Sequence, residues 1–355
     1  MNRFQHQNIF RLCALLLAAL ALFGCAGTSK VNESTPAPVS ETQGSTPAVE
    51  TEEVILVTTP DASGNTPVRS TAVPVVTAEP TATPEPKPDG LIGWSVGGFV
   101  NREDTVKTES EYVSDKLHFT VTRVYDTEHF TRKVVYFVTD LYIRDLNCLR
   151  TYAANEFTTK EHQFFKYVHT IAEKANALWA MTGDYCGHHM HSVIIRNGVV
   201  YDTKPYDDYD ILFLYKDGTM ETVTVKEYNA DALRDDIWQA WQFGPSLLDS
   251  EGHAITDFGN SKIKNFNPRS IIGYYEPGHY VFLTVDGRQR YSGGLSLAEC
   301  AVLMESLGCK IAFNLDGGES AELYWNGGVY NTPCDGGRTL SDIIYLIDED
   351  TDPQS

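Results

Sequence analysis

The composition of the chain changes sharply near residue 90, and this change limits which part can fold. Residues 26 to 90 consist mainly of Thr, Pro, Glu, Ser and Ala and hold ten of the sixteen prolines of the 355-residue chain. Such a segment buries too little apolar surface to offset the entropy lost on ordering. We therefore expect residues 25–90 to be a disordered spacer, residues 91–350 to form the folded domain and residues 351–355 to be a tail.

The first 24 residues have the pattern of a signal sequence, with Arg3 and Arg11 and then an apolar run from Leu12 to Phe23. Twelve helical residues extend about 18 Å, too little for a bilayer core of about 30 Å. Leu22-Phe23-Gly24-Cys25 resembles a bacterial lipobox, which predicts cleavage before Cys25 and acylation of its thiol. The alternative is an ordinary signal peptide that happens to contain a cysteine. We expect a protein outside the cytoplasm, lipid-anchored to the bacterial cell membrane.

The charge balance excludes most proteins that bind nucleic-acid backbones. The chain has 28 Lys and Arg against 48 Asp and Glu, a formal net charge of −20. A negative field of this size repels polyphosphate chains, because their binding depends on an excess of cationic side chains. Any contact with phosphate must therefore come from a local basic pocket.

Between residues 91 and 350, strand patterns alternate with helix patterns. Residues 134–143 are rich in β-branched and aromatic side chains, which predicts a strand, and an apolar stripe over residues 160–176 predicts a helix. Asn197-Gly198 between two apolar runs predicts a β-hairpin. The expected fold is α+β (mixed α/β), a single globular domain in which helices flank a mixed central sheet.

The segment from Tyr280 to Leu323 predicts a strand, a helix and a second strand. Residues 280–285 are an apolar strand that ends at Asp286, and residues 310–315 are another that ends at Asp316. Between them, Ser296 and Glu299 have capping-box spacing, which predicts the start of a helix. The helix is expected to end at Gly308, which tolerates the left-handed backbone conformation.

This order of elements has a chemical consequence for the two aspartates. A right-handed crossover makes the two strands parallel, and as neighbours they would carry Asp286 and Asp316 to one crevice at the carboxyl ends of the strands. Two close carboxylates need a proton or a cation between them, which predicts a metal site or an acid–base pair. The alternative is that each Asp caps a turn before glycine.

Several segments together resemble the phosphodiester glycosidase family over about residues 134 to 347. Each match alone is weak, but their consistent order makes the resemblance specific. In two places the chain departs from the family pattern: it has Thr182 where Asn is common, and Glu319 where a third glycine is frequent. The matching segments are Thr182-Gly183-Asp184-Tyr185, Phe243-Gly244-Pro245-Ser246-Leu247-Leu248, Asn267-Pro268-Arg269-Ser270-Ile271-Ile272-Gly273, Val285-Asp286-Gly287-Arg288, Ser292-Gly293-Gly294-Leu295-Ser296-Leu297, Asn314-Leu315-Asp316-Gly317-Gly318-Glu319-Ser320, and Asn331-Thr332-Pro333 before Arg338.

The resemblance implies hydrolysis of a sugar-1-phosphodiester at its glycosidic bond. Asp316 or Asp286 would be the catalytic carboxylate, with Asp184 and Glu319 as the next candidates. Arg269 could instead form a structural ion pair. The residues expected to bind the phosphate or other parts of the substrate are Arg269, Arg288, Gly317, Gly318, Ser320 and His189.

A divalent cation is a further expectation. Carboxylate and turn carbonyl oxygens suit Ca²⁺ or Mg²⁺, so Asp286 and Asp316 are its candidate ligands. The segment His188-His189-Met190-His191 suggests a transition-metal cluster, but no Cys or acid follows at metal-ligand spacing. We favour a polar loop in which His189 contacts substrate.

The cysteines do not have the pattern of a disulfide framework. Five remain after Cys13 and Cys25 are set aside, an odd number. Cys148 and Cys186 each follow a strand and could form a bridge, whereas Cys300 and Cys309 flank a helix and cannot pair across it.

Two other functions stay open beside the glycosidase. One is a lipoprotein without catalytic activity that binds a cell-envelope glycan, with Glu319 marking a lost activity. The other is a phosphodiesterase that cuts the P–O bond. The sugar, the leaving group and the oligomeric state do not follow from the sequence.

Overall fold

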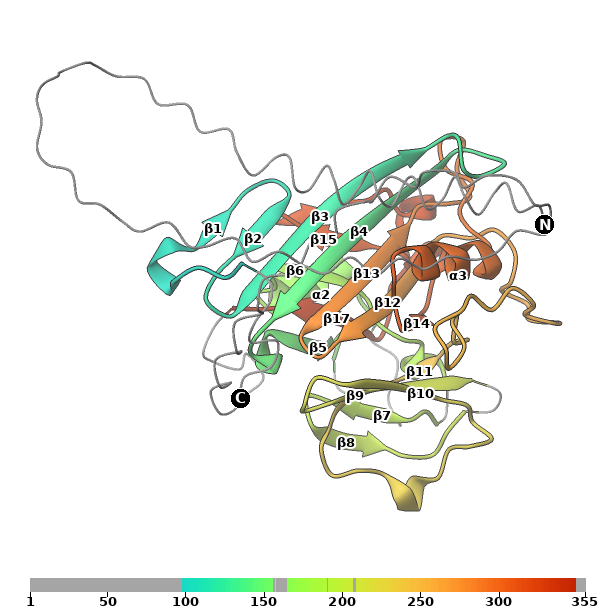
Figure 1. The fold of residues 1–355 in the computed structure, drawn as a ribbon, viewed down its shortest axis with the longest axis horizontal. Coiled ribbons are helices and arrows are strands. Elements are labelled where there is room, and N and C mark those ends of the chain that lie inside the picture. Colours follow the sequence, from blue (N-terminus) through green and yellow to red (C-terminus); the bar gives the residue numbers. More distant parts are fainter. Residues whose placement is uncertain (1–97, 156, 158–164, 190, 207–208, 349–355) are drawn as a thin grey trace, which may run out of the picture. The chain divides into compact units, whose positions relative to one another are not determined.

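The computed structural model describes residues 98–155, 157, 165–189, 191–206 and 209–348, which lie within one compact unit (Figure 1). The predicted signal sequence, Cys25, the spacer and the tail fall outside these residues. The described part is predominantly β-sheet and contains two α-helices. None of the helices described is both long and apolar enough to cross a membrane.

The first sheet has seven strands, and every neighbouring pair is antiparallel. The predicted strand at residues 134–143 is confirmed as β4 with these bounds. In spatial order the strands are β1 (Val106–Lys107), β2 (Glu111–Val113), β3 (Leu117–Asp126), β4 (Val134–Ile143), β13 (His279–Val285), β12 (Arg269–Glu276) and β14 (Ile311–Asn314).

The other two sheets have five antiparallel strands each. The hairpin at Asn197-Gly198 is confirmed, with φ of +53° and +80°, because its tight turn needs two left-handed residues. The second sheet is β16 (Gly328–Val329), β15 (Leu323–Trp325), β6 (Trp179–Thr182), β17 (Asp342–Leu346) and β5 (Leu149–Ala153). The third sheet is β10 (Met220–Val223), β9 (Asp210–Tyr215), β11 (Ile237–Phe243), β7 (Ile194–Arg196) and β8 (Val199–Asp202).

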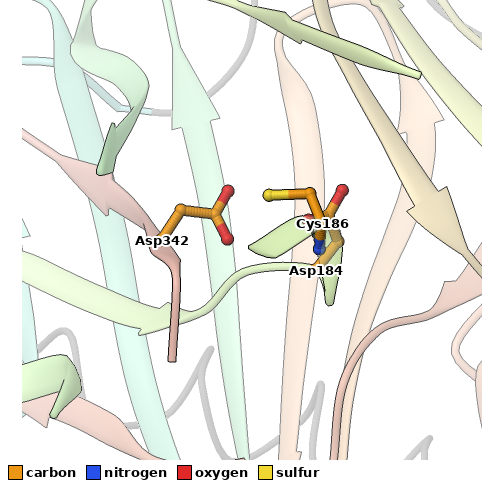
Figure 2. Close-up of side chains that lie close together, drawn as sticks. All are labelled: Asp184, Cys186 and Asp342. Carbon is orange, nitrogen blue, oxygen red and sulfur yellow. Dashed lines mark hydrogen bonds between the residues drawn. The ribbon is translucent and has the colours of Figure 1, made fainter. Parts of the chain in front are cut away.

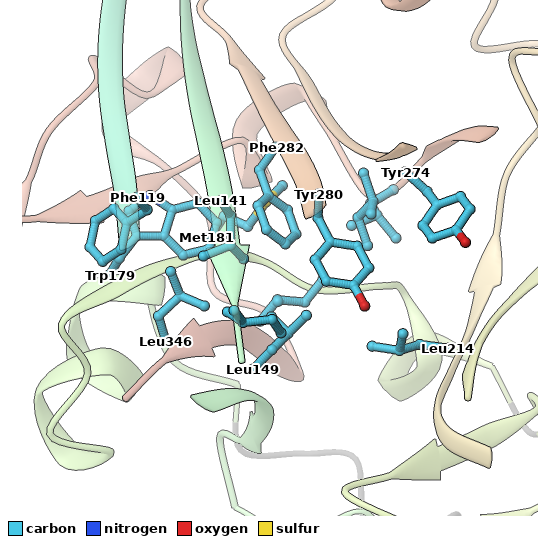
Figure 3. Packing of buried hydrophobic residues seen from close by; sticks show 14 of the residues in the cluster. Phe119, Leu141, Leu149, Trp179, Met181, Leu214, Tyr274, Tyr280, Phe282 and Leu346 are labelled. Atoms are coloured by element: carbon cyan, nitrogen blue, oxygen red, sulfur yellow. The ribbon is translucent and has the colours of Figure 1, made fainter. Parts of the chain in front are cut away.

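The largest hydrophobic cluster joins all three sheets (Figure 3). Phe282 comes from the first sheet, Trp179 and Leu346 from the second, and Leu214 from the third. Strand β13 is mostly apolar because both of its faces are buried: Tyr280 and Phe282 enter this cluster, while Val281, Leu283 and Val285 enter another. Each such fully buried side chain contributes about 1.5–3 kcal/mol.

Each α-helix covers the outer face of one sheet. Helix α3 (Leu297–Ser306) packs on the first sheet and begins at the predicted capping box of Ser296 and Glu299. It is followed by Gly308 with φ of +87°, as the predicted helix end requires. Helix α2 (Val168–Lys174) packs on the second sheet. It is shorter than the helix expected over residues 160–176, of which residues 160–164 are not described.

The expected mixed sheet is wrong, because β12 lies between the two strands that were expected to be neighbours. Strand β12 pairs antiparallel with β13 on one side and with β14 on the other. Strands β13 and β14 are therefore parallel to each other, as predicted, but they do not pair. The sequence pattern identified residues 267–273 only as a motif and missed the strand inside it.

Candidate active site

The carboxyl ends of β13 and β14 and the start of β12 meet at one edge of the first sheet. Val285 pairs with Arg269, and Asn314 pairs with Ile271. Asp286 and Asp316 follow directly at this edge. They are separated by two strand spacings, about 10 Å, because β12 lies between them.

A pocket of about 210 Å³ opens at this edge, and we call it the basic pocket. It contains three cationic side chains and one carboxylate, that of Asp316. In a chain with a net charge of −20, this is the local excess of positive charge that binding of a phosphate requires. The pocket is lined by Phe243, Lys262, Ile263, Asn267, Arg269, Arg288, Asn314, Leu315, Asp316, Gly317 and Gly318.

Asp316 is buried and forms an ion pair with Arg338. Arg338 Nη2 donates to Asp316 Oδ2 at 2.6 Å, and the Gly317 amide donates to Oδ1 at 2.9 Å. Arg338 Nε also donates to the buried Ser320 Oγ at 2.9 Å. Burial raises the pKa of Asp316, and the Arg338 charge is the largest influence opposing it. Asp316 therefore offers a basic carboxylate of fixed orientation at the pocket wall.

Asp286 is equally buried but does not line the basic pocket. Its Oδ1 accepts from Asn331 Nδ2 at 2.9 Å and from the Thr332 amide at 3.2 Å, and its Oδ2 accepts from the Tyr291 hydroxyl at 3.3 Å. Burial raises the pKa of Asp286. The expected pairing of the two strands is wrong, because β12 lies between them, and Asp286 holds the loop at Asn331 and Thr332.

Arg269 lies at the buried side of the pocket and donates to backbone carbonyls. Its Nε donates to Leu295 O at 3.0 Å, and its Nη2 donates to Ile263 O at 2.6 Å and to Asn265 O at 2.5 Å. Among the described residues no carboxylate forms a salt bridge with it. Burial lowers the pKa of Arg269, yet a guanidinium stays protonated in proteins. Its charge therefore reaches the pocket without a neutralising partner.

Arg288 and Glu319 lie at the exposed side of the pocket. The side chain of Arg288 is 47% exposed, and its Nε and Nη2 donate to Asn267 Oδ1 at 3.1 and 2.8 Å. Glu319 Oε1 lies 4.0 Å from Arg288 Nη1. Gly318 has φ of +64°, and a Cβ there would lie only 3.2 Å from Arg288 Nη2. A glycine at this position therefore lets the guanidinium lie against the backbone.

The two glycine amides that were expected to bind phosphate already donate within the protein. The Gly317 amide donates to Asp316 Oδ1, and the Gly318 amide donates to Pro268 O at 3.0 Å. A Cβ on Gly317 would lie 2.7 Å from the same Pro268 carbonyl oxygen. These glycines therefore allow close packing of the turn against the start of β12, which shapes the pocket.

Asp184 belongs to a different, fully buried cluster with Arg196 and Asp342. Arg196 Nη2 donates to Asp184 Oδ2 at 2.8 Å, and its Nε donates to Asp342 Oδ2 at 3.1 Å. Asp184 also accepts from the backbone amides of Cys186 and Gln242, at 2.9 and 3.1 Å. None of these residues lines the basic pocket. Asp184 therefore joins loops and strands in the interior.

The three histidines of the segment 188–191 have separate partners. His188 stacks on Tyr185 with ring centroids 3.9 Å apart, and His189 stacks on Tyr206 at 3.6 Å. His191 Nδ1 lies 3.3 Å from Asp202 Oδ2. The described parts of this segment therefore form a polar and aromatic loop, the interpretation that the sequence favoured over a metal cluster.

The described side chains do not provide a ready cation site. Among the described residues, Asp184, Cys186 and Asp342 form the one group of three metal-type ligands with ligand atoms within 4.8 Å (Figure 2). The guanidinium of Arg196 already bonds both carboxylates of this group. Asp286 and Asp316 share no hydrogen-bond partner, and their oxygens accept from N–H and O–H donors. We therefore assign no catalytic step to a metal, and the Ca²⁺ or Mg²⁺ expectation stays a prediction.

All five cysteines in the described residues are free and buried. The suggested bridge between Cys148 and Cys186 is therefore wrong, and Cys186 lies instead near Ser341, with Sγ to Oγ at 3.5 Å. Burial raises the pKa of both thiols. Neither has the low pKa and exposure of a reactive cysteine.

Two residues of the site were missed as candidates. Arg338 was noted only as the residue that follows the last matching segment, and it lies 22 positions after the Asp316 that it contacts. Lys262 lines the basic pocket from a loop without a recognisable motif. A local pattern could have suggested neither contact, because both depend on loops that the three sheets bring together.

Comparison with known proteins gives matches to the folded part of the chain. Residues 175–347 match the family model described as phosphodiester glycosidase. The SPbeta prophage-derived uncharacterized protein YomE of Bacillus subtilis (strain 168) is 32% identical over 184 residues, which is 49% of this chain and 28% of that protein. The chain thus spans little more than a quarter of this relative's length.

The fold is similar to a solved structure from zebrafish. This is the catalytic domain of N-acetylglucosamine-1-phosphodiester alpha-N-acetylglucosaminidase, auto-inhibited by its pro-peptide, with a TM-score of 0.55 and 20% identity. The match covers 69% of this chain and 88% of that one. At 20% identity this similarity concerns the fold, and the match to the phosphodiester glycosidase family model lies within the same part of the chain, at residues 175–347.

Proposed function

We propose that the domain hydrolyses the glycosidic bond of a sugar-1-phosphodiester, with Asp316 as the catalytic carboxylate. The observation that carries this proposal is the shared pocket of Asp316 with Lys262, Arg269 and Arg288. The zebrafish enzyme is named for N-acetylglucosamine-1-phosphodiesters, and we propose the same class of linkage here. Thr182 and Glu319 depart from the family pattern, so the sugar and the leaving group can differ.

The three cations account for binding and departure of the phosphate. A phosphate monoester is a good leaving group, so strong general-acid help matters less than in ordinary glycosidases. Stabilisation of its negative charge matters more. The exposed guanidinium of Arg288 can give two parallel hydrogen bonds to phosphate oxygens, Lys262 adds a point charge, and the buried charge of Arg269 supports both.

Asp316 acts on the sugar side of the scissile bond. Its carboxylate either activates a water molecule or stabilises the positive charge that develops at the anomeric carbon. The raised pKa of Asp316 makes it a stronger base than an exposed aspartate, while Arg338 fixes its orientation. The water oxygen ends on the sugar carbon, and the phosphate leaves with the bridging oxygen.

Hydrolysis in ¹⁸O-labelled water tests this proposal. The purified protein is incubated with a set of sugar-1-phosphodiesters, and the products are identified by mass spectrometry. Label in a free reducing sugar beside an unlabelled phosphomonoester supports the glycosidase. Label in the phosphate shows cleavage of the P–O bond by a phosphodiesterase. Saturable binding without product supports a glycan-binding lipoprotein, and either of the last two results contradicts the proposal.

We also propose that Cys25 carries a lipid that holds the domain at the outer face of the bacterial membrane, where it meets cell-envelope glycans. The support is the lipobox pattern and the spacer composition. Metabolic labelling with an alkyne fatty acid should mark the wild-type protein but not Cys25→Ser. Equal labelling of both proteins, or of neither, contradicts the anchor.

Chelation tests the predicted divalent cation separately. Full activity after exhaustive dialysis against EDTA contradicts a requirement. Loss of activity that Ca²⁺ or Mg²⁺ restores supports one.

A further inference from the structure

A group of aromatic side chains lies beside the basic pocket. We call it the aromatic cluster, and its ring centroids lie between 3.6 and 6.1 Å apart along a continuous series of contacts. Tyr206 is 38% exposed, so the cluster reaches the surface. Its members are Tyr185, His189, Tyr206, Tyr209 and Phe243.

The aromatic cluster is continuous with the pocket at two points. Phe243 belongs to both, since it lines the pocket and its ring lies 5.4 Å from that of Tyr209. Arg338, which pairs with Asp316, also lies over the ring of Tyr185 at 5.3 Å. A molecule that contacts both the cluster and the cations therefore passes Asp316.

The interior holds the loops of the cluster in place. Gln242 is fully buried, and its Nε2 donates to the carbonyls of Tyr206 and Tyr209 at 2.9 and 3.0 Å. The backbone amide of Gln242 donates to Asp184. Asp184 also accepts from the backbone amide of Cys186, the residue just after Tyr185. Asp184 thus acts as a positioning residue for both loops, which makes the cluster a preformed surface.

The aromatic cluster also offers polar groups. His189 Nε2 is a buried atom for which the described residues provide no hydrogen-bond partner. Burial lowers the pKa of His189, which favours the neutral ring at physiological pH. Apolar ring faces with a few convergent polar atoms are typical of sites for small polar molecules with apolar faces.

We propose that the aromatic cluster is the subsite for a sugar ring of the substrate, which stacks on Tyr206 and its neighbours while the linked phosphate occupies the basic pocket. This deepens the proposed function and rests on it for the location of the phosphate. The ligand class is a pyranose-1-phosphate unit. A free inorganic anion has no ring to stack on the aromatic cluster, and an apolar peptide has no phosphate for the basic pocket.

Calorimetric titration of the mature protein with two probes, glucose-1-phosphate and inorganic phosphate, tests the subsite. Tyr206→Ala should weaken binding of glucose-1-phosphate roughly five- to ten-fold, because one stacking surface is lost. Its affinity for inorganic phosphate should stay within about two-fold of wild type. Tyr206→Phe should keep most of the sugar affinity, since the ring remains. Arg288→Ala should weaken binding of both probes.

Tyr201 supplies a matched control. It is a tyrosine of nearly equal exposure, 39%, and its ring contacts Phe157. Tyr201→Ala should leave both affinities unchanged. Equal loss of both probes in Tyr206→Ala, no loss in either, or wild-type binding of glucose-1-phosphate no tighter than that of phosphate would overturn the subsite.

The subsite and the glycosidase fail separately. If Tyr206→Ala selectively loses glucose-1-phosphate while no diester is hydrolysed, the subsite stands and the catalytic proposal fails. If diesters are hydrolysed and Tyr206→Ala keeps the wild-type KM and probe affinities, the catalytic proposal stands and the subsite fails.

Discussion

Arg338 and Arg196 both form ion pairs with buried aspartates, but they differ in exposure and in charge balance. The side chain of Arg338 is 32% exposed and pairs with one carboxylate, that of Asp316. Arg196 is fully buried between two carboxylates, those of Asp184 and Asp342. The first pair retains surface that a ligand can reach, whereas the second uses its single cation to hold the fold. Exposure and charge count, more than residue type, separate a candidate catalytic pair from a structural one.

The largest expected effect is on turnover, and it comes from the pair of Asp316 and Arg338 and not from the buried cluster of Asp184, Arg196 and Asp342. Asp316→Asn should lower kcat by about 10³-fold, because the amide neither activates water nor stabilises positive charge. It should fold normally, since the amide oxygen can still accept from Arg338. The measurement is kcat together with the thermal unfolding midpoint. A folded Asp316→Asn protein with full turnover contradicts the assignment.

Asp286→Asn is the control for that substitution. Asp286 follows β13, which is parallel to β14 but separated from it by β12. Asp286 is also buried, but its contacts are to Asn331, Thr332 and Tyr291. Its loss should change stability more than turnover. A fall in kcat equal to that of Asp316→Asn, in a folded protein, would place Asp286 in the reaction as well.

The second prediction concerns stability. Arg196→Met should lower the free energy of unfolding by about 3–5 kcal/mol, because two buried carboxylates lose their cation. Arg338→Met should cost less, since Arg338 is partly exposed and Asp316 keeps the Gly317 amide. Urea unfolding measures both. A larger loss in Arg338→Met would reverse the roles of the two clusters.

The third prediction is a pH dependence of stability that comes from Asp342, in the buried cluster of Asp184, Arg196 and Asp342. Burial, with the nearby Asp184 charge, raises the pKa of Asp342 to about 7, against 3.8 for an ordinary aspartate. The folded protein therefore binds more protons than the unfolded chain between these values. The contribution of protonated Asp342 to the free energy of unfolding is therefore complete below about pH 4 and is lost as the pH rises through about 7.

The variant Asp342→Asn isolates this effect, because it keeps an acceptor for Arg196 but does not titrate. Relative to this variant, the wild type should lose stability with rising pH, at up to about 1.4 kcal/mol per pH unit. Urea unfolding at several pH values measures the difference. Parallel stability curves for the two proteins would show that Asp342 does not titrate in this window.

Local sequence patterns predicted local structure well in this protein. The strand at residues 134–143, the Asn197-Gly198 turn and the Ser296 capping box depend on neighbouring residues alone, and each is confirmed. The placement of β12 depends instead on long-range pairing, which no short segment encodes. That one strand lies between the strands that precede Asp286 and Asp316, and its pairing with both of them is antiparallel.

In the candidate site, too, the sequence predicted what depends on local patterns and missed what depends on long-range contacts. The pattern around Asp316 and Arg288 and the family resemblance were enough to expect both residues near a phosphate. The contacts of Arg338, Lys262 and the aromatic cluster come from loops far apart in the chain, so their proximity depends on the fold. Asp184 was misleading for a related reason: a buried aspartate beside a glycine has the same local pattern whether it faces a pocket or an arginine.

The smallest expected effect concerns Glu319, whose carboxylate lies 4.0 Å from Arg288. This negative charge competes with a phosphate for the same guanidinium, so Glu319→Gln should lower KM roughly three-fold, consistent with up to about 1 kcal/mol between exposed charges. Because salt screens exposed charges, the decrease in KM should be largest at low ionic strength and should nearly vanish in about 0.5 M NaCl. Steady-state kinetics at low and at high salt measure this difference. If Glu319→Gln instead abolishes turnover at every salt concentration, Glu319 is the catalytic carboxylate. Arg338 would then only orient the site and Arg196 would hold the fold, while catalysis would depend on the exposed pair of Arg288 and Glu319.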